Sequence, residues 1–372
     1  MSASLDHAVA LLSDLIRIPS FSREEQGTAA CLTQWALQAG LWVDRCGNNV
    51  WSIQHPFDSN RPTLVLVSHH DTVKPNAGYT RDPFQPMQED GRLFGLGSND
   101  AGASLAAQAE AFRQLSQRTD LGINLIWLAA AEEEISGAGG VSAWLADPTI
   151  QGWYQESLAN QQAWTAIVGE PTGMQLAIAE RGLLVLDGLA IGVAGHAARN
   201  EGDNALYHAL CDIQALQAIR FPEVSEWLGE TRLSVTAIHT DNQQHNVIPD
   251  RCTYVVDVRL NELNPPEEIL ARLQANVKGL LTARSFRLRP TFIPPTHPLV
   301  EAGSKLGMRC FGSPTLSDKA LLPFPAVKCG PGDSARSHTA NEFIVLHEIN
   351  EAIDTYIHWV EGYSQSIHTT SS

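Results

Sequence analysis

Five short groups of residues in this sequence combine side chains that can bind metal ions. The groups are Ser68-His69-His70-Asp71, Gly95-Leu96-Gly97-Ser98-Asn99-Asp100, Glu132-Glu133-Glu134, Gly169-Glu170 and Ser337-His338. Each group alone is weak evidence, because adjacent glutamates are usually solvated and an aspartate after a glycine-rich loop usually caps a helix. Histidine nitrogens and carboxylate oxygens are the ligands of hard and borderline divalent metals. Together the groups therefore predict a metal site.

Such a set of carboxylates also indicates a reaction. Several carboxylates in one partly dry cleft repel one another strongly unless cations neutralise them. Two metal ions that share one bridging carboxylate would do so and would hold a water between them. The pKa of metal-bound water falls towards about 7, which gives a hydroxide nucleophile at neutral pH. A free carboxylate beside that water could take its proton and later give it to a leaving amine.

Short apolar runs alternate with helical stretches through the first half of the chain. The expected strands are 63–67, 123–128 and 163–168, and the expected helices are 6–18, 28–37, 101–115 and 140–145. This alternation predicts an α/β layer with a mostly parallel central sheet. Sheets of this kind place their functional sites at the carboxyl ends of the strands, where three of the five groups stand.

The pattern changes after about residue 179. Strands are expected at 183–193, 233–238, 253–260 and 285–289, with helices at 204–219 and 266–280. This β-α-β-β-α-β order is the split arrangement of ferredoxin-like domains. We therefore expect an inserted domain at 180–291 within a discontinuous catalytic domain at 1–179 and 292–372. The proline-rich stretch 290–298 leads back to a strand at 321–329 and a final helix at 344–360.

Length and charge narrow the class of protein. The chain has 372 residues, 44% of them hydrophobic, which suits a soluble protein of two domains. Its 41 acidic and 25 basic residues give a net charge of -16 at pH 7, the opposite sign from that of most nucleic-acid binders. We expect no nucleic-acid partner, and we interpret most of the acidic excess as a solvated surface.

Cysteine spacing and the N-terminal segment indicate a cytoplasmic protein. The six cysteines are scattered, with no pair two residues apart, so neither a disulfide framework nor a cysteine zinc site is expected. The N-terminus lacks the basic flank and apolar core of a secretory signal. Apolar runs also stay well short of the roughly 20 residues of a membrane helix, so no membrane association is expected.

The order of these motifs along the chain resembles one known family. It is similar to the dinuclear-zinc amidohydrolases and exopeptidases that include acetylornithine deacetylase, succinyl-diaminopimelate desuccinylase and glutamate carboxypeptidase. The resemblance begins at Leu15-Ile16-Arg17-Ile18-Pro19-Ser20 and ends at Gly330-Pro331-Gly332, His338, Thr339 and Glu342. It implies a zinc-exopeptidase-like catalytic domain with an inserted ferredoxin-like dimerisation or lid domain. It also implies two divalent metal ions per subunit, zinc first, with cobalt or manganese as alternatives.

The resemblance assigns five metal ligands. His69 and Glu170 would hold the first metal, Glu134 and His338 the second, and Asp100 would bridge both.

Glu133 would be the general base and then the general acid, and Asp71 would hold the His69 imidazole. Glu132 stands where relatives often carry aspartate, so the resemblance makes the second and third glutamates the base and the ligand. A shift of one residue within the triplet would exchange base and ligand. His70 lies between two site residues on an extended segment, so its side chain should point elsewhere, in a structural role.

The inserted domain contributes further expected residues. His196 resembles the family histidine that stabilises the tetrahedral oxyanion in the active site of the partner subunit, which implies a homodimer. Arg259, with Asn246 beside it, is suited to clamp a substrate carboxylate. The alternative for Arg259 is a salt bridge to Asp257. Arg181 is a weaker candidate for the carboxylate, or a hinge at the domain junction.

The substrate indicated by the resemblance is an N-acyl amino acid. The stretches 313–318 and 332–338 are most similar to the acetylornithine and acetylcitrulline deacetylases of arginine biosynthesis, so N-acetyl-L-ornithine is the expected substrate. N-acetyl- or N-succinyl-citrulline, N-succinyl-ornithine, N-acetyl-lysine and short peptides, cleaved by a dipeptidase or carboxypeptidase, are the alternatives. A metal-dependent binding protein is the non-enzymatic alternative, and the presence of Glu133 favours catalysis over it.

Overall fold

The chain divides into two compact units. A computed structural model describes residues 2–54, 56–199 and 201–370. The first unit holds the described residues up to Ile178, Ile293–Phe311 and those from Ser317 onward, and the second holds Ala179–Phe292 and Gly312–Leu316. All six cysteines are free thiols. Within the described residues, no helix has the length and apolar character needed to cross a membrane.

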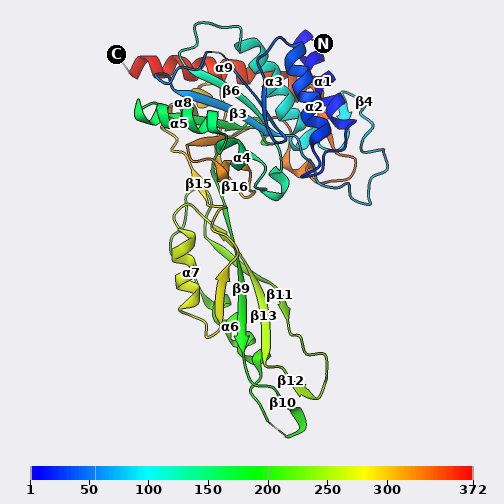
Figure 1. Cartoon of the computed structure of the whole chain (residues 1–372), viewed down its shortest axis with the longest axis vertical. Helices are drawn as coiled ribbons and strands as arrows, with labels where there is room; N and C mark the ends of the chain where they lie inside the picture. Colours follow the sequence, from blue (N-terminus) through cyan, green and yellow to red (C-terminus); the bar gives the residue numbers. More distant parts are fainter. Residues whose placement is uncertain (1, 55, 200, 371–372) are drawn as a thin grey trace. The chain divides into compact units, whose positions relative to one another are not determined.

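The first unit is built on a mixed sheet of nine strands, of which β15 belongs to the second unit (Figure 1). Its order is β1 (Asp44–Cys46), β2 (Asn49–Ile53), β6 (Asn124–Ala130), β3 (Thr63–His69), β7 (Trp164–Val168), β17 (Ala326–Lys328), β8 (Leu176–Glu180) and β15 (Thr291–Phe292), with β16 (Cys310–Ser313) also paired to β8. The four neighbouring strands β6, β3, β7 and β17 run parallel. The pairs β1–β2, β2–β6, β17–β8 and β15–β8 are antiparallel. The α/β class is confirmed, but the parallel arrangement is limited to the centre of the sheet.

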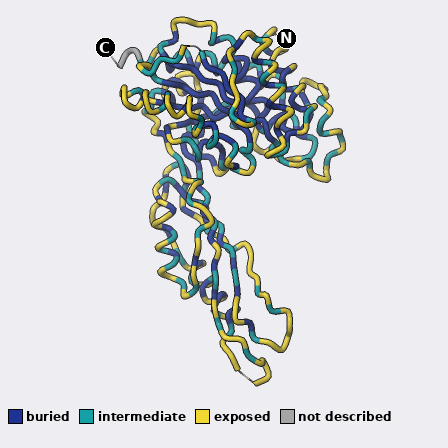
Figure 2. The backbone as a smooth tube through the Cα atoms, in the orientation of Figure 1, coloured by how far each residue is buried: buried dark blue, intermediate teal, exposed yellow. Residues whose placement is uncertain are grey.

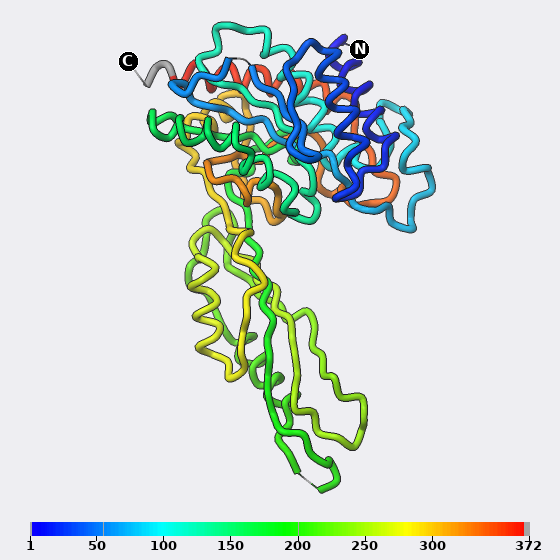
Figure 3. Tube along the Cα trace, viewed as in Figure 1, coloured from blue at the N-terminus to red at the C-terminus, as the bar shows by residue number. Residues whose placement is uncertain are grey.

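Helices cover both faces of this sheet. On one face α3 (Ala103–Leu115) packs on β3 and β6, and α1 (Ala3–Ile16) and α9 (Leu346–Thr370) pack on α3, so that both ends of the chain belong to this unit (Figure 3). On the other face Trp144 of α4 (Val141–Leu145) joins a cluster with Trp51 and Trp164. The central strands are buried on both faces (Figure 2), which explains their continuous apolar sequence.

The remaining elements of the first unit are short or peripheral. They are α2 (Gln26–Gln38), α5 (Pro148–Ala159), α8 (Pro298–Lys305) and the small sheet of β18 (Phe343–Val345), β5 (Arg92–Phe94) and β4 (Met87–Glu89). Two expected elements have other boundaries in the structure. The predicted helix at 344–360 starts at Leu346, because the residues before it pair with β5, and it continues to Thr370. The predicted strand at 321–329 is reduced to β17, because a helical turn, Asp318–Leu321, precedes it.

The second unit has the predicted β-α-β-β-α-β order. Its elements are β9 (Gly182–Ile191), α6 (Ala205–Ala218), β11 (Arg232–His239), β13 (Arg251–Leu260), α7 (Pro266–Gln274) and β14 (Leu280–Ala283). The sheet order is β11-β13-β9-β14 with every neighbouring pair antiparallel, which is the ferredoxin-like arrangement. A small ribbon pairs β10 (Gly195–His196) with β12 (Val247–Ile248).

The end of this unit differs from the expectation. Helix 266–280 was predicted too long and strand 285–289 too late, because α7 stops at Gln274 and β14 starts at Leu280. The buried Asp212 carboxylate accepts hydrogen bonds from the backbone N–H groups of Lys278 and Gly279 at 2.8 and 2.9 Å. The Gln274 side chain accepts a hydrogen bond from Leu281 N–H at 2.7 Å. These side-chain contacts hold a turn where the apolar pattern suggested more helix.

Candidate metal centre and active site

Neighbouring parallel strands bring the predicted ligands to one edge of the central sheet. Strand β3 lies between β6 and β7, with His69 opposite Ala130 and Val67 opposite Val168. The residues that follow these strands, Asp71, Glu133, Glu134 and Glu170, are therefore neighbours in space although they are far apart in the sequence. Asp100 comes from the loop before α3, and His338 from the segment before β18.

Asp100 faces both histidines with different oxygens. Its Oδ1 lies 3.3 Å from Nε2 of His69, and its Oδ2 lies 3.6 Å from Nε2 of His338. Nε2 of His338 also lies 3.1 Å from Oε2 of Glu134. Nε2 of His69 lies 3.7 Å from Oε1 of Glu170 and 3.9 Å from Oε2 of Glu133. This arrangement suits a carboxylate shared between two metal positions, with one histidine on each side.

Two overlapping triads have donor atoms close enough to bind a metal ion. One is His69, Asp100 and Glu134, the other is His69, Glu133 and Glu170, and the donor atoms within each triad lie within 4.8 Å of one another. Both triads contain one imidazole and two carboxylates, a donor set that fits zinc and related divalent cations. The structure thus brings all five predicted ligands and Glu133 into one cluster.

The electrostatics of this cluster favour a bound cation. Burial, with the charge of Asp100 beside it, raises the pKa of Glu170 to about 8. Burial and the nearby Glu170 also raise the pKa of Glu133 well above its ordinary value. The hydrogen bond to Glu134 raises the pKa of His338 to about 9. Each shift shows a site that favours added positive charge, as expected where mostly buried carboxylates crowd together. The residues present therefore fit a divalent metal centre.

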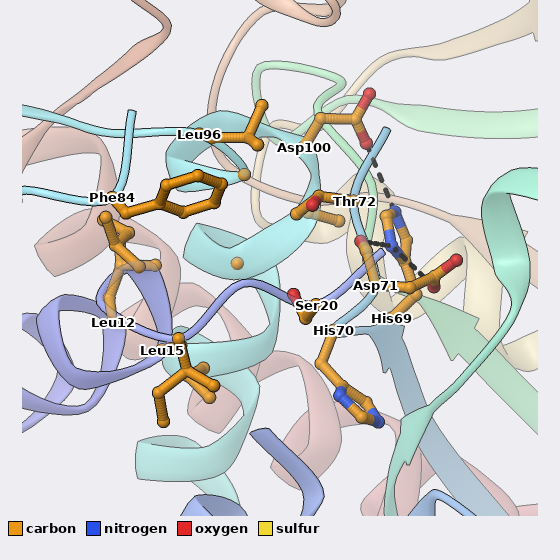
Figure 4. Close-up of a pocket in the computed structure, with 15 residues that line it drawn as sticks. Leu12, Leu15, Ser20, His69, His70, Asp71, Thr72, Phe84, Leu96 and Asp100 are labelled. Atoms are coloured by element: carbon orange, nitrogen blue, oxygen red, sulfur yellow. Dashed lines mark hydrogen bonds and ion pairs between the residues drawn. The ribbon is translucent and has the colours of Figure 1, made fainter. Parts of the chain in front are cut away.

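The orientation of His69 leaves one nitrogen for a metal. Its Nδ1 lies 2.9 Å from the backbone carbonyl oxygen of Asp71 and 3.4 Å from Oδ1 of that residue (Figure 4). A proton on Nδ1 donated to the carbonyl leaves the Nε2 lone pair directed at the cluster. The nearer partner is thus the Asp71 backbone, rather than the carboxylate expected from the sequence.

The Asp71 carboxylate has a second set of partners that sequence reasoning missed. It accepts hydrogen bonds from the backbone N–H groups of Glu133 at 3.0 Å and Glu134 at 3.2 Å, and from the Ser22 hydroxyl at 2.7 Å. Asp71 therefore fixes the turn that presents both glutamates. No sequence motif links these residues, since Asp71 follows β3 and Glu133 follows β6.

Glu132 has a different role from its two neighbours. Its backbone is left-handed, with φ of 55°, and its carboxylate accepts a hydrogen bond from Gly139 N–H at 3.1 Å. A Cβ atom at Gly137 would come within 2.5 Å of the Glu132 Cβ, so this loop has room for the Glu132 side chain only because glycine stands there. The Glu132 N–H donates to the buried Glu25 at 3.1 Å. Glu132 thus organises the loop, and Glu25 is a further supporting residue that no sequence signal identified.

His70 points away from the cluster, as predicted (Figure 4). Its ring is buried and lies 2.8 Å from the Thr28 hydroxyl and 3.1 Å from the carbonyl oxygen of Asn48. Burial lowers the pKa of His70 to about 4, so the ring is neutral at pH 7. A neutral ring that donates to Asn48 and accepts from Thr28 satisfies both nitrogens, which agrees with a structural role.

The other predicted site residues lie in the second unit. Arg259 pairs with Asp257 through two hydrogen bonds of 2.8 and 3.0 Å, which is the salt bridge that the sequence left as an alternative. The Arg181 guanidinium donates to the backbone carbonyls of Leu228, Glu230 and Arg259.

His196 lies on the β10–β12 ribbon, and Asn246 lies directly before β12. Both are exposed, and the Asn246 carbonyl oxygen accepts a hydrogen bond from Ala197 N–H at 3.0 Å. Nδ1 of His196 accepts a hydrogen bond from Ala198 N–H at 3.2 Å, which directs the ring's donor function to Nε2.

Comparison with known proteins agrees with this description. Residues 65–362 match the pattern of peptidase family M20/M25/M40. The chain is 28% identical over 277 residues to a succinyl-diaminopimelate desuccinylase from Acidiphilium cryptum, covering 72% of each chain. It is 31% identical over 294 residues to the enzyme of that name from Stenotrophomonas maltophilia, covering 76% of this chain and 73% of the relative.

Solved structures share the fold. The aminopeptidase PepT from Bacillus cereus superposes with a TM-score of 0.74 at 18% identity, over 96% of this chain and 98% of the other. A dinuclear metal-binding peptidase of the M20 family from Bacillus subtilis superposes with a TM-score of 0.69 at 15% identity, over 96% and 98%. The expectation of a metal-dependent hydrolase of amide bonds is thus confirmed, and the chain belongs to peptidase family M20/M25/M40.

Proposed function

We propose that the protein removes the acyl group from N-acyl amino acids, with N-acetyl-L-ornithine as its substrate in cytoplasmic arginine biosynthesis. The observation that carries metal-dependent deacylation is the placement of Asp100, whose two oxygens face His69 and His338 separately. The choice of N-acetyl-L-ornithine rests on the resemblance of stretches 313–318 and 332–338 to the acetylornithine deacetylases. His69 and Glu170 would hold one cation, Glu134 and His338 the other, with zinc as the metal. Cations held there would polarise the acyl carbonyl and lower the pKa of a water molecule at the site.

Glu133 would move the proton. Its Oε2 lies 3.9 Å from His69 Nε2 at the edge of the cluster, and its side chain keeps 12% exposure, so water can reach it. A carboxylate in this position can accept a proton from the attacking water and deliver it to the leaving amine. The hydrogen bonds that the backbone N–H groups of Glu133 and Glu134 donate to the Asp71 carboxylate support this role, because they hold Glu133 in place while it gains and loses the proton.

Arg259 and Asn246 would bind the substrate carboxylate. The Asp257 carboxylate pairs with Nε and one terminal nitrogen of Arg259, and this leaves the outer edge of the guanidinium for a second carboxylate. Asp257 would then orient the Arg259 guanidinium and leave its outer edge available to the substrate carboxylate. Arg181 has three backbone acceptors of its own, so we propose that it supports this region and makes a weaker contribution to binding.

We further propose a homodimer in which His196 serves the partner's active site. Strand β11 lies at one edge of the second unit's sheet, where another strand can add. Large apolar side chains are exposed on the same unit: Tyr207 and Leu210 on α6, Ile238 on β11 and Val247 on β12. An edge strand and exposed apolar residues on one small unit support a subunit interface there.

Desuccinylation is a second candidate, because the relatives described above are named succinyl-diaminopimelate desuccinylases. A substrate panel decides between the two. It would hold N-acetyl and N-succinyl forms of ornithine, citrulline, lysine and glutamate, with N-succinyl-diaminopimelate, each assayed with added Zn²⁺ or Co²⁺ and with a chelator. The proposal predicts the highest kcat/KM for N-acetyl-L-ornithine. Preference for a succinylated substrate would favour desuccinylation over deacetylation. If none of the acyl amino acids is hydrolysed in a metal-dependent way, both candidates are contradicted.

A further inference from the structure

Glu342 contacts the loop that presents Asp100. This glutamate is four residues beyond His338 and is only 2% exposed. Its Oε1 accepts hydrogen bonds from the N–H groups of Asn99 at 2.8 Å and Asp100 at 2.9 Å, and its Oε2 accepts one from Gly97 at 3.0 Å. One buried carboxylate therefore holds three N–H groups of the loop.

This loop needs such a partner because its backbone is irregular and buried. Gly97 has φ of 72°, and a Cβ there would come within 2.6 Å of Thr72. Asp100 has φ of -117° and ψ of 100°, outside the helical range, directly before α3. Buried N–H groups without a partner in regular structure are costly, so each of them needs an acceptor. Glu342 supplies that acceptor.

A second contact connects the same two segments. The Asn99 side chain donates to the Asp333 carbonyl oxygen at 3.0 Å and accepts from Asp333 N–H at 3.1 Å. Glu342 and Asn99 thus join the Asp100 loop to the segment 333–342 on both sides of His338. The distance between Asp100 and His338 depends on this alignment.

We propose that Glu342 is a positioning residue for the two-metal site. It fixes the Asp100 loop against the segment that carries His338, so that Asp100 can face both metal positions. It has no contact with substrate in this role and moves no proton. The inference rests on the proposed function, since it requires that the cluster bind two cations.

The test measures zinc binding to chelator-stripped protein by titration calorimetry. The kcat and KM values are then measured on the enzyme reloaded with zinc. Glu342→Gln keeps the size of the side chain but places an amide NH₂ against backbone N–H donors. We expect wild type to bind two zinc ions per chain, and Glu342→Gln to bind at least one of them about 10- to 100-fold more weakly. With metal in excess, kcat should fall while KM stays within about twofold, because no substrate contact is lost.

Glu110→Gln is the matched control. Glu110 is a 1% exposed glutamate of the same unit, and its partners Arg113 and Gln114 are in α3. The Glu110→Gln protein should bind both zinc ions with the affinity of wild type. A folded Glu342→Gln protein with wild-type zinc affinity would overturn the inference, whereas a wild type that binds no zinc would instead refute the proposed function. Where circular dichroism shows that Glu342→Gln is unfolded, Glu342→Asp replaces it. The shorter side chain cannot reach all three N–H groups, so wild-type zinc affinity in that variant overturns the inference equally.

Discussion

The Asp71 carboxylate accepts a hydrogen bond from the backbone N–H of Glu133 at 3.0 Å. Its other oxygen accepts from the next N–H, that of Glu134, at 3.2 Å. The proposed general base and a proposed metal ligand are therefore held by one buried residue, which follows the strand that ends at His69. The buried carboxylates of Asp71 and Glu342 thus hold the backbone of the segments that carry the proposed metal ligands.

Replacement of Asp71 tests this arrangement. Asp71→Asn puts one amide NH₂ where two N–H groups and a hydroxyl now find acceptors, so at least one buried donor loses its partner. We expect the free energy of unfolding to fall by about 1–3 kcal/mol, measured by urea titration of metal-free protein, and kcat to fall with it. Ser22→Ala removes only the hydroxyl bond and should cost about 1 kcal/mol. Equal stability and kcat in Asp71→Asn and wild type would contradict the assigned role.

Glu133 is expected to be essential for turnover but not for metal binding. Glu133→Ala should lose at least about a hundredfold in kcat, the usual scale for loss of a general base, and should retain its bound metal by elemental analysis. The matched control is Glu132→Gln, in the same triplet, whose carboxylate binds Gly139 and not the cluster. A large loss in the control with full activity in Glu133→Ala would show that the register of the triplet is wrong.

Arg259 is expected to act on substrate binding. Arg259→Ala removes a charged hydrogen-bond donor worth about 1.5–3 kcal/mol, so KM should rise by roughly 10- to 150-fold with kcat less affected. Arg284→Ala is the control, because Arg284 forms an exposed pair with Asp187 in the same unit. An unchanged KM for Arg259→Ala would leave the Asp257 salt bridge as its only role.

The proposed dimer predicts complementation between inactive variants. Glu133→Ala and His196→Ala should each be inactive alone, but a mixed dimer would contain one site with both residues intact. Random exchange of equal amounts should restore about one quarter of wild-type activity, since half the dimers are mixed and each has one working site. Subunit exchange is verified by mass spectrometry with differently tagged chains. No recovery after complete exchange would place His196 in its own subunit's site or outside catalysis.

Local patterns were sufficient to predict the elements that carry the site. Apolar runs identified β3, β6 and β7, and the polar residues at their ends gave His69 and Glu170 as candidates. The position of His70 also followed from strand geometry alone. These predictions depend on residues near one another in the sequence.

Contacts between distant segments could not be predicted in this way. The early end of α7 depends on Asp212, 66 residues before Lys278 in the chain. Glu25 accepts from the backbone N–H of Glu132, and no sequence motif contains it. Glu342 belongs to the quoted motif, but its three bonds to the distant Asp100 loop could not be predicted from that motif. The antiparallel pairing at both sides of the sheet likewise depends on which strands meet, which their composition does not specify.

The central claim is that the cluster around Asp100 works through two bound cations. The most direct test is to strip the protein with a chelator, remove the chelator, and titrate Zn²⁺ or Co²⁺ back while hydrolysis of N-acetyl-L-ornithine is followed. The account predicts negligible activity in the stripped protein and recovery that is complete at two metal ions per chain. Full activity in protein shown by elemental analysis to contain no metal would contradict it.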